Sequence, residues 1–478
     1  MMGIDYEGID GMNQTLQTSY LWEVSAIMTE SKYTKSDYEH RTLIIGLGKT
    51  GLSCARFLAK QGVPFIVMDD REQPPELPAL REQFPDTELL LGGFDTTVME
   101  SCNQIIISPG VSLYDPEIAK IIDSGVPVVG DIEIFARHAD APVIAITGSN
   151  GKSTVSAMVA EMARTAGRVV RLGGNFGMPA LDLLADSPPD LYVLELSSFQ
   201  LESTMSLNCT AAAVLNLSPD HLDRYRTMEE YLDAKLRIYR GDGAVIVNAD
   251  DPLLKNHTPA ARKLLYFGSG VPQPGQYGVR KRHGELWLAK GGECLMPVSE
   301  LHINGFHNVS NALAALALGD AAGLPQGAML KALKSFKGLP HRMEWVAEWD
   351  GVTWYNDSKG TNVGATVAAL QGLNGKAVLI AGGLGKGADF SLLKEAVAQK
   401  CRAVVLIGRD APLIEKALDR VVPVVHAGDM QDAVQQASHY ATSGDSILLS
   451  PACASFDMFV NYEDRGRVFV AAVKDLLL

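Results

Sequence analysis

The sequence predicts an α/β protein with three domains, each built around a mainly parallel β-sheet. Short apolar runs alternate with helical patterns along most of the chain, and this alternation is typical of parallel strands joined by helices. In each part of the chain, some of these runs end in a glycine-rich or polar turn. The length of 478 residues suits two to four domains at roughly 150 residues per domain.

We place the domains at residues 37–130, 131–337 and 338–478. The boundary between the second and third falls at a Gly- and Pro-containing segment, residues 337–342, which is a candidate hinge. Residues 1–36 are polar and mixed in charge, without the positive charge and following apolar run of a secretory signal. We therefore expect them to form a loosely held N-terminal extension.

Composition narrows the class of protein. With 47% hydrophobic and 21% charged residues, the chain fits a globular protein with filled cores. The 42 basic and 56 acidic residues give a net charge of −14, which argues against binding nucleic acid or acidic membranes. No apolar run approaches the roughly 18 residues that span a bilayer, so we expect no stable membrane insertion. The six scattered cysteines lack C-x-x-C spacing, so we expect a cytoplasmic protein.

The first domain opens with a β-α-β unit. Strand 42–45 leads into the turn 46–51, which reads Gly-Leu-Gly-Lys-Thr-Gly, then a helix and a second strand ending at Asp69. The glycines permit close approach of the main chain to a diphosphate, and the acid can accept a ribose hydroxyl. A later strand, 104–107, ends in the turn 108–110 at the same sheet edge. These features favour nucleotide binding over a purely structural turn.

The second domain contains a candidate phosphate loop. The apolar strand 142–146 is followed by residues 147–154, Thr-Gly-Ser-Asn-Gly-Lys-Ser-Thr, and then by a helical pattern. Main-chain N–H groups and a helix N-terminus can hold polyphosphate oxygens there. Lys152 can reach the outer phosphates, and Ser153 or Thr154 can offer a hydroxyl to Mg²⁺. The spacing is shorter than the common phosphate-loop pattern, and an ordinary strand-to-helix turn is the alternative.

Further strands are expected at 191–195 and 211–216, and a helix at 228–240. Glu195 lies near the carboxyl end of its strand, where a carboxylate suits Mg²⁺ beside a nucleotide; the alternative is an acid that caps the following turn. Between residues 240 and 300 the pattern weakens into short strands with many glycines. We interpret that stretch as a peripheral excursion without chemistry.

One lysine of the predicted helix lies on its apolar face. Lys235 shares that face with Leu232, Leu236 and Tyr239 at helical spacing. Such a lysine pairs with an acid, extends its ammonium to solvent, or loses its charge through a lowered pKa. A neutral amine can also take up CO₂ and become a carbamate that ligates a metal. From the residues alone, extension to solvent is the favoured interpretation.

Two other polar residues next to a predicted strand or helix are candidate ligand contacts. His221 comes just after a predicted strand and could contact metal or phosphate, with a simple turn as the alternative. Asn308 stands near the start of an Ala- and Leu-rich helix and could orient a base or phosphate, or could cap the helix.

In the third domain, three polar turns follow predicted strands and should share one sheet edge. Asp357 in the first turn could hold a ribose, while Lys386 and Ser455 in the others could bind a carboxylate; ordinary loop turns are the alternative. Further strands of this domain are expected at 377–380, 403–407 and 446–449.

Several of these segments resemble the Mur ligase family, and they occur in the order seen there. The likeness covers about residues 41 to 475. The matching segments are TGSNGKST, LELSSFQLE, NLSPDHLDRY, AKLRIY, HNVSNALAA, GLPHR, NDSKGTN and SPACASFD.

The resemblance implies a role for each domain: a Rossmann-like domain for the UDP of the substrate, a central phosphate-loop ATPase-type domain, and a Rossmann-like domain for the incoming amino acid. Implied substrate contacts are Gly46, Leu47, Gly48, Thr50, Asp69, Arg71, Ser108, Gly110, Lys386, Ser455 and Tyr462, the last standing where phenylalanine is expected. Implied ATP contacts are Gly148, Ser149, Asn150, Gly151, Lys152, Ser153, Thr154, Asn308, Arg342 and Asp357. Implied catalytic residues are Lys152, Asn175, Glu195, His221 and Lys235, of which Glu195, His221 and Lys235, together with Ser153, would be at the metal.

The resemblance also implies a reaction. An ATP-dependent ligase would join D-glutamate to UDP-N-acetylmuramoyl-L-alanine through an acyl phosphate, in cytoplasmic peptidoglycan precursor synthesis. It would use two Mg²⁺ ions and a carbamate on Lys235 formed from CO₂, and would act as a monomer. Another Mur-type or folylpolyglutamate-type amide ligase is the nearest alternative. A nucleotide-dependent dehydrogenase would leave the phosphate loop without a role, and a non-catalytic nucleotide switch is a third possibility.

Overall fold

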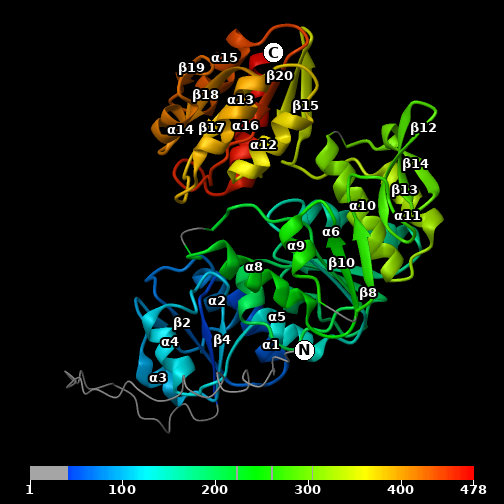
Figure 1. Cartoon of the computed structure of the whole chain (residues 1–478). Coiled ribbons are helices and arrows are strands. Elements are labelled where there is room, and N and C mark those ends of the chain that lie inside the picture. The colour runs from blue at the N-terminus through cyan, green and yellow to red at the C-terminus, as the bar shows by residue number, and fades with distance from the viewer. Residues whose placement is uncertain (1–40, 222–223, 260–261, 304, 478) are drawn as a thin grey trace, which may run out of the picture.

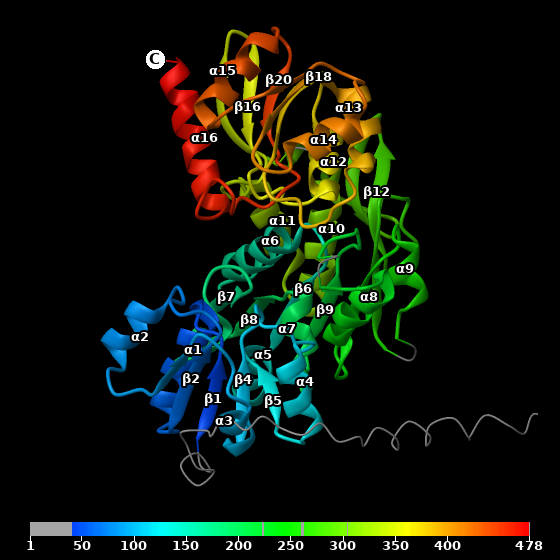
Figure 2. The ribbon, with the colours of Figure 1, turned by 90° about the vertical axis from the view of Figure 1, so that its left-hand side faces the viewer.

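A computed structural model describes residues 41–477 except 222–223, 260–261 and 304. These residues form three α/β units arranged in a row (Figures 1 and 2). The first unit, in blue, and the third, in orange, lie at opposite ends of the central one. The predicted class, three domains with mainly parallel sheets, is confirmed. The predicted extension 1–36 lies outside the described residues.

The first unit is a five-stranded parallel sheet in the order β3-β2-β1-β4-β5. Its strands are β1 (Thr42–Ile45), β2 (Phe65–Asp69), β3 (Leu89–Leu91), β4 (Gln104–Ile107) and β5 (Val128–Gly130). Its helices are α1 (Lys49–Lys60), α2 (Leu77–Gln83), α3 (Thr96–Ser101), α4 (Pro116–Asp123) and α5 (Asp131–His138). The strand order reverses at β1, so the turns after β1 and β4 meet at the edge where such sheets bind ligands.

The central unit is a nine-stranded sheet in the order β14-β13-β12-β11-β10-β9-β6-β8-β7. Its strands are β6 (Val143–Thr147), β7 (Val170–Gly174), β8 (Leu191–Glu195), β9 (Ala211–Val214), β10 (Ala244–Asn248), β11 (Leu264–Phe267), β12 (Tyr277–Arg282), β13 (Glu285–Lys290) and β14 (Glu293–Pro297). Its helices are α6 (Lys152–Thr165), α7 (Ser198–Glu202), α8 (Met228–Leu236), α9 (Pro252–Asn256), α10 (Phe306–Ala321) and α11 (Gln326–Ser335), with short 3₁₀ turns η2 (Ala180–Leu183), η3 (Arg237–Tyr239) and η4 (Val298–Glu300).

The interpretation of residues 240–300 as peripheral is wrong for its first part. β10 is fully buried and pairs in parallel with β9 and β11, so it belongs to the body of the sheet. Its last residue, Asn248, donates from Nδ2 to Leu215 O at 2.7 Å. Only the antiparallel ribbon β12-β13-β14 extends outward as an edge. Surrounding glycines and turn residues hid a five-residue apolar strand.

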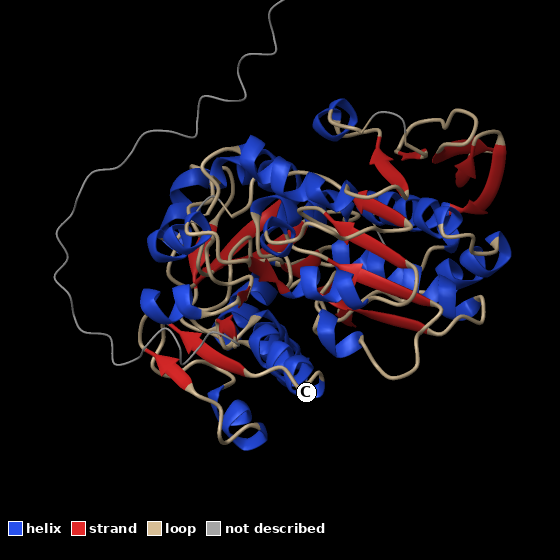
Figure 3. Cartoon of the chain, turned by 90° about the horizontal axis from the view of Figure 1, so that it is seen from below, coloured by secondary structure: helices blue, strands red, loops and turns tan. Residues whose placement is uncertain are grey.

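The third unit is a six-stranded sheet in the order β15-β16-β20-β17-β18-β19, parallel except for the β15-β16 pair. Its strands are β15 (Glu344–Trp349), β16 (Val352–Asn356), β17 (Ala377–Gly382), β18 (Cys401–Ile407), β19 (Val424–His426) and β20 (Ser446–Leu449). Its helices are α12 (Val363–Gly372), α13 (Leu393–Lys400), α14 (Ala411–Leu418), α15 (Met430–Tyr440) and α16 (Tyr462–Leu477), with the 3₁₀ turn η5 (Phe390–Leu392). Figure 3, a view from below, shows the helices in blue beside the strands in red.

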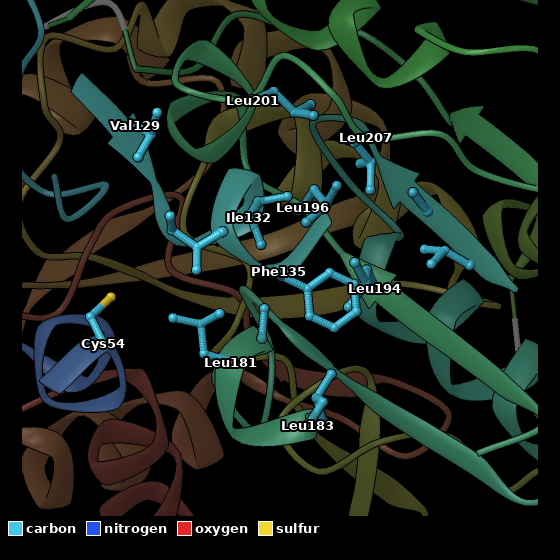
Figure 4. Packing of buried hydrophobic residues seen from close by; sticks show 14 of the residues in the cluster. Cys54, Val129, Ile132, Phe135, Leu181, Leu183, Leu194, Leu196, Leu201 and Leu207 are labelled. Carbon is cyan, nitrogen blue, oxygen red and sulfur yellow. The ribbon is translucent and has the colours of Figure 1, made fainter. Parts of the chain in front are cut away.

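The first two units share one hydrophobic core. Ile132 and Phe135 of α5 pack with Leu181 and Leu183 of η2 and with Leu194 of β8 (Figure 4). This cluster runs without a break from the first sheet into the central one, whereas the third unit is built on two clusters of its own. Apolar burial therefore joins the first two units more firmly than either is joined to the third.

Two negative findings concern the described residues. None of their helices is both long enough and apolar enough to cross a membrane. The six cysteines are free, and five of them are buried.

Gly51 tests the packing of α1 against β1. A Cβ at Gly51 would lie 2.0 Å from Gly46 O, whereas a Cβ at Gly48 would meet nothing within 4 Å. We expect Gly51→Ala to lower the free energy of unfolding by about 2 kcal/mol, because the helix must move away from the strand. Denaturant unfolding followed by circular dichroism measures this, with Gly48→Ala as the matched control. Equal stability of the two variants would contradict the packing described.

Candidate active site at the junction of the three domains

The phosphate loop, residues 147–154, joins β6 to α6 at the carboxyl edge of the central sheet. Gly151 has a φ of 83°, and an added Cβ would lie 2.4 Å from Asn311 Oδ1, so this position requires glycine. α6 begins at Lys152 without a side-chain cap. The first amide groups of the helix therefore remain available to an anion.

Three polar side chains gather near Glu195, at the end of β8: two bond to Glu195, and the third bonds to one of those two. Ser153 Oγ forms a short hydrogen bond with Glu195 Oε2, and Asn175 Nδ2 donates to Glu195 Oε1 at 2.8 Å. From the third unit, Arg342 Nη2 donates to Ser153 Oγ at 2.6 Å. Because Ser197 caps α7, the alternative that Glu195 caps the following turn is wrong.

Two lysines converge on the phosphate loop. Lys152 Nζ donates to Gly148 O and Ser149 O, each at 2.9 Å. Lys235 Nζ donates to Gly148 O at 3.1 Å and lies 4.5 Å from the centre of the Tyr231 ring. Lys235 is only 2% exposed, so the interpretation that it extends to solvent is wrong. The loop covers it, and sequence periodicity does not reveal a covering loop.

Burial and mutual repulsion make both amines easier to deprotonate. Burial holds the pKa of Lys235 well below its ordinary value, and the neighbouring Lys152 lowers it further. Burial also lowers the pKa of Lys152, against the attraction of Glu195 and Asp220. Both amines donate hydrogen bonds to main-chain carbonyls of the loop. A bound polyanion would satisfy this excess of positive charge.

His221 lies in the loop after β9 with a φ of 56°. Its Nε2 is 3.7 Å from Asp220 Oδ2, and its ring packs edge-on against Phe199 at 4.7 Å between centroids. Burial lowers the pKa of His221, and so do Lys386, Lys152 and Lys235. The imidazole is therefore neutral near pH 7, the form that contacts metals or accepts hydrogen bonds.

A cavity of about 390 Å³, called here the nucleotide cavity, opens between the central and third units. Asp357 lines it, and burial raises the pKa of this carboxyl to about 7. Asn308 also lines it; the N-cap residue of α10 is Gly305, so the alternative that Asn308 caps this helix is wrong. Other residues around this cavity include Asn150, Gly151, Thr154, Asn311, Arg342 and Lys359.

A second cavity, of about 810 Å³, lies along the first sheet and is called here the first-domain cavity. Among the predicted residues it is lined by Gly46, Gly48, Thr50, Arg71, Ser108, Gly110, Asn175 and Tyr462. Leu47 and Asp69 do not line it. Asp69 is 1% exposed, accepts from Leu47 N at 2.6 Å and pairs with Arg71 at 2.7 Å. The carboxylate expected at a ribose thus supports the turn, and Asp70 faces the cavity instead.

A third cavity, of about 410 Å³, is lined by both His221 and Lys386 and is called here the third-domain cavity. Ser455 is 2% exposed and is not among the residues lining these three cavities. A shared carboxylate site of Lys386 and Ser455 stays a prediction. The expectation that the three turns of the third unit share an edge agrees with their bonding: Ser450 Oγ donates to Asp357 Oδ2 at 2.8 Å.

Lys359 is the main residue that the sequence analysis left without a role. It lines both the nucleotide cavity and the first-domain cavity, and its Nζ lies 3.7 Å from the centre of the Tyr462 ring. Burial, with Arg342 nearby, lowers the pKa of Lys359 to about 8. Its position two residues after Asp357 at a strand end was the available signal.

Two of the predicted metal-binding residues, Ser153 and Glu195, have the kind of oxygen atoms that Mg²⁺ prefers. Among the residues described, no group of three or more His, Cys, Asp or Glu side chains is arranged as a metal site. Mg²⁺, however, keeps several waters and is held by one or two protein oxygens together with substrate phosphates. Ser153 and Glu195 at the phosphate loop supply a hydroxyl and a carboxylate of this kind.

Family models match most of the chain. Residues 40–130 match the N-terminal domain of MurD-like Mur ligases, residues 146–319 the Mur ligase middle domain, and residues 341–453 the Mur ligase glutamate ligase domain. The chain belongs to the Mur ligase family. The phosphate loop lies within the middle domain, and Asp357 and Lys386 lie within the glutamate ligase domain.

Among curated Mur ligases, the chain is similar to two proteins named UDP-N-acetylmuramoylalanine–D-glutamate ligase. The one from Nitrosococcus oceani is 55% identical, covering 91% of this chain and 97% of the relative. The one from Pseudomonas aeruginosa is 52% identical, covering 92% and 98%.

Two solved Mur ligase structures have the same fold. UDP-N-acetylmuramate-alanine ligase from Thermotoga maritima has a TM-score of 0.60 at 21% identity, covering 91% of this chain and 99% of that one. MurF from Acinetobacter baumannii has a TM-score of 0.59 at 16% identity, covering 92% of each chain.

The Arg342–Ser153 hydrogen bond predicts that the third domain contributes to nucleotide binding. We expect Arg342→Ala to weaken ATP binding about tenfold, because a charged hydrogen-bond donor at the nucleotide cavity is lost. Isothermal titration calorimetry with a non-hydrolysable ATP analogue measures this. Arg420→Ala, an exposed arginine of the same domain, is the control, and equal affinities in both variants would refute the prediction.

Proposed function

We propose that this Mur ligase joins D-glutamate to UDP-N-acetylmuramoyl-L-alanine with consumption of ATP, in the synthesis of peptidoglycan precursors. The similarity to curated D-glutamate ligases, at 52–55% identity over almost their entire length, carries this proposal. The arrangement of the cavities supports it: the nucleotide cavity is lined by the phosphate loop, and it shares Lys359 with the first-domain cavity and Ser218 with the third-domain cavity.

In the first step, a carboxylate oxygen of the acceptor's alanine attacks the γ-phosphorus of ATP, and ADP leaves. This transfer spreads negative charge over the phosphoryl oxygens. Lys152 and the first turn of α6 would stabilise that charge from one side, and Arg342 from the other. Mg²⁺, held by Ser153 and Glu195, would neutralise phosphate charge. The acceptor then carries an acyl phosphate.

In the second step, the amine of D-glutamate attacks the acyl carbon, phosphate leaves and the amine loses a proton as the amide forms. Asn175 and His221 would lie near the acyl group and phosphate, and Lys359, Lys386, Ser455 and Tyr462 would hold the amino acid's carboxylates. Water would compete for the acyl phosphate, so closure of the third domain would favour amide formation.

We further propose that Lys235 carries a carbamate. Burial, with Lys152 nearby, holds the pKa of Lys235 well below its ordinary value, which favours the neutral amine that adds CO₂ with release of a proton. The carbamate would replace an amine whose charged form is repelled by Lys152 with an anion that Lys152 attracts. It would also give the site an oxygen ligand beside the phosphate loop.

The nearest competing function is a folylpolyglutamate-type amide ligase. Such an enzyme has no need for a separate UDP-binding domain, whereas this chain has a complete first domain with a large cavity. Cytoplasmic location, the monomeric state and the absence of nucleic-acid partners stay predictions.

A phosphate-release assay tests the reaction. We expect release to require ATP, UDP-N-acetylmuramoyl-L-alanine and D-glutamate together, and Lys152→Ala to lower it by at least about a thousandfold, because the charge of the transferred phosphoryl group is left unstabilised. A panel with L-alanine, L-lysine and folate acceptors distinguishes the competing ligases. Equal turnover with another acceptor or amino acid, or without either, would overturn the assignment.

The carbamate has its own test. We expect Lys235→Ala to lose activity and short carboxylic acids such as formate to restore part of it, because the acid replaces the carbamate oxygens. Labelling with ¹³C-bicarbonate should give a carbamate NMR signal in the unmodified enzyme that is missing in the variant. Lys255→Ala, which changes an exposed lysine of the same domain, should keep both. Undiminished activity of Lys235→Ala would exclude the carbamate.

A further inference from the structure

Arg465 is a buried cation whose role the reaction above does not use. It lies in the first turn of α16, which forms the outer edge of the third unit in Figure 2. Its side chain is 0% exposed. Burial lowers the pKa of Arg465 to about 10, so the guanidinium remains charged at neutral pH.

The guanidinium joins two loops at the carboxyl edge of the third sheet. Nε donates to Ser358 Oγ at 3.0 Å, and Nη2 donates to Ser358 O at 2.8 Å. Nη1 donates to Cys453 O at 3.1 Å. Ser358 follows β16 and Cys453 follows β20, and these two strands are neighbours in the sheet. Arg465 therefore connects the loop after β16 to the loop after β20.

The rest of the first turn of α16 supports the same loop. Ser358 Oγ donates to Tyr462 O at 2.8 Å, and the Tyr462 ring lies under Lys359 Nζ. Asn356 Nδ2 lies 3.4 Å from Gly466 O. The first turn of α16 thus supports residues 356–359, and Arg465 is a buried charged residue of that turn.

This arrangement is costly if its only purpose is packing. Removing a cation from water costs several kcal/mol, and a buried charge is usually paired with an opposite one. The three hydrogen-bond acceptors of Arg465 are a hydroxyl and two carbonyls, all neutral, and the carboxylates of Asp457 and Asp357 attract its charge without outweighing the effect of burial. The rigid planar fork explains why arginine, and not lysine, connects three acceptors on two loops.

Both loops carry residues of the candidate active site. Ser358 stands between Asp357, in the nucleotide cavity, and Lys359, which lines both that cavity and the first-domain cavity. Cys453 lies two residues before Ser455. A shift of either loop would change the position of Lys359 relative to Ser455, and the buried charge lies behind the edge where carboxylates of an amino acid would arrive.

We propose that Arg465 is a positioning residue for the incoming amino acid. It holds the loops after β16 and β20 in register, so that Lys359 and Ser455 face the same ligand, and its charge favours a dicarboxylate at this edge. This inference rests on the proposed ligase function and adds a residue that touches neither substrate nor nucleotide.

Steady-state kinetics of two variants, Arg465→Gln and Arg465→Lys, test it. Phosphate release gives KM for D-glutamate, ATP and UDP-N-acetylmuramoyl-L-alanine, and calorimetry gives Tm. We expect Arg465→Gln to raise KM for D-glutamate about tenfold or more, with the other two KM values changed less than about twofold. Arg465→Lys, which keeps the charge but loses the fork, should fall between this variant and the unmodified enzyme.

The control is Arg467→Gln, two residues along the same helix. The Arg467 side chain is 65% exposed and pairs with Asp464, its neighbour on the helix, at 3.1 Å, so the kinetics of this variant should match those of the unmodified enzyme. A lower kcat with unchanged KM values, a lower Tm with unchanged kinetics, or failure of both Arg465 variants to fold would assign Arg465 to the fold alone and overturn the proposal.

The failure of the proposed function would look different. If the unmodified enzyme used another amino acid, the same selective rise would be sought in KM for that amino acid. If the unmodified enzyme joined no amino acid, both proposals would fall, and the Arg465 variants would not be needed to show it.

Discussion

Buried positive charge beneath and around the phosphate loop is the constraint on which this active site depends. Lys152 and Lys235 donate to carbonyls of the same loop, Arg342 reaches it from the third domain, and Lys359 lies beside the cavity next to it. Mutual repulsion and lost hydration destabilise these cations in the protein alone. Phosphate oxygens and the proposed carbamate would reverse both effects, so substrate binding and chemistry would draw on the same electrostatic imbalance.

The distribution of apolar contacts explains how such a site can open. The first and central domains share a continuous core, whereas the third has separate cores and reaches the phosphate loop through polar contacts. Arg342 bonds Ser153, and Asn362 Nδ2 lies 3.3 Å from Asn150 Oδ1 and 3.1 Å from Asp220 Oδ2. Polar contacts of this kind exchange readily with water. The first and central domains are therefore firmly joined, and the third domain can separate from them. Such a separation would let substrates enter before the cations surround them.

Lys235 and Arg465 show two outcomes for a buried cation that bonds carbonyls. The lysine amine titrates readily when desolvated, so burial and Lys152 favour its neutral form and make it reactive. The guanidinium keeps its charge under the same desolvation and fixes loops by its planar fork. The chemistry of the two side chains, at similar burial, separates a candidate reactive group from a candidate positioning group.

Local patterns alone determined the three-domain α/β class, the strands that precede the glycine-rich turns 46–51 and 147–154, and the positions of Lys152, Ser153 and Glu195 at or just after strand ends, because motif spacing and strand ends are short-range features. Tertiary structure decided the rest. Strand β10 was hidden among glycines, and Asp69 was drawn to Leu47 and Arg71, which no spacing reveals. The burial of Lys235 depends on a loop 87 residues away, and the link from Arg465 to Ser358 spans 107 residues. Contacts at such separations arise from sheet order, which the sequence of each segment does not encode.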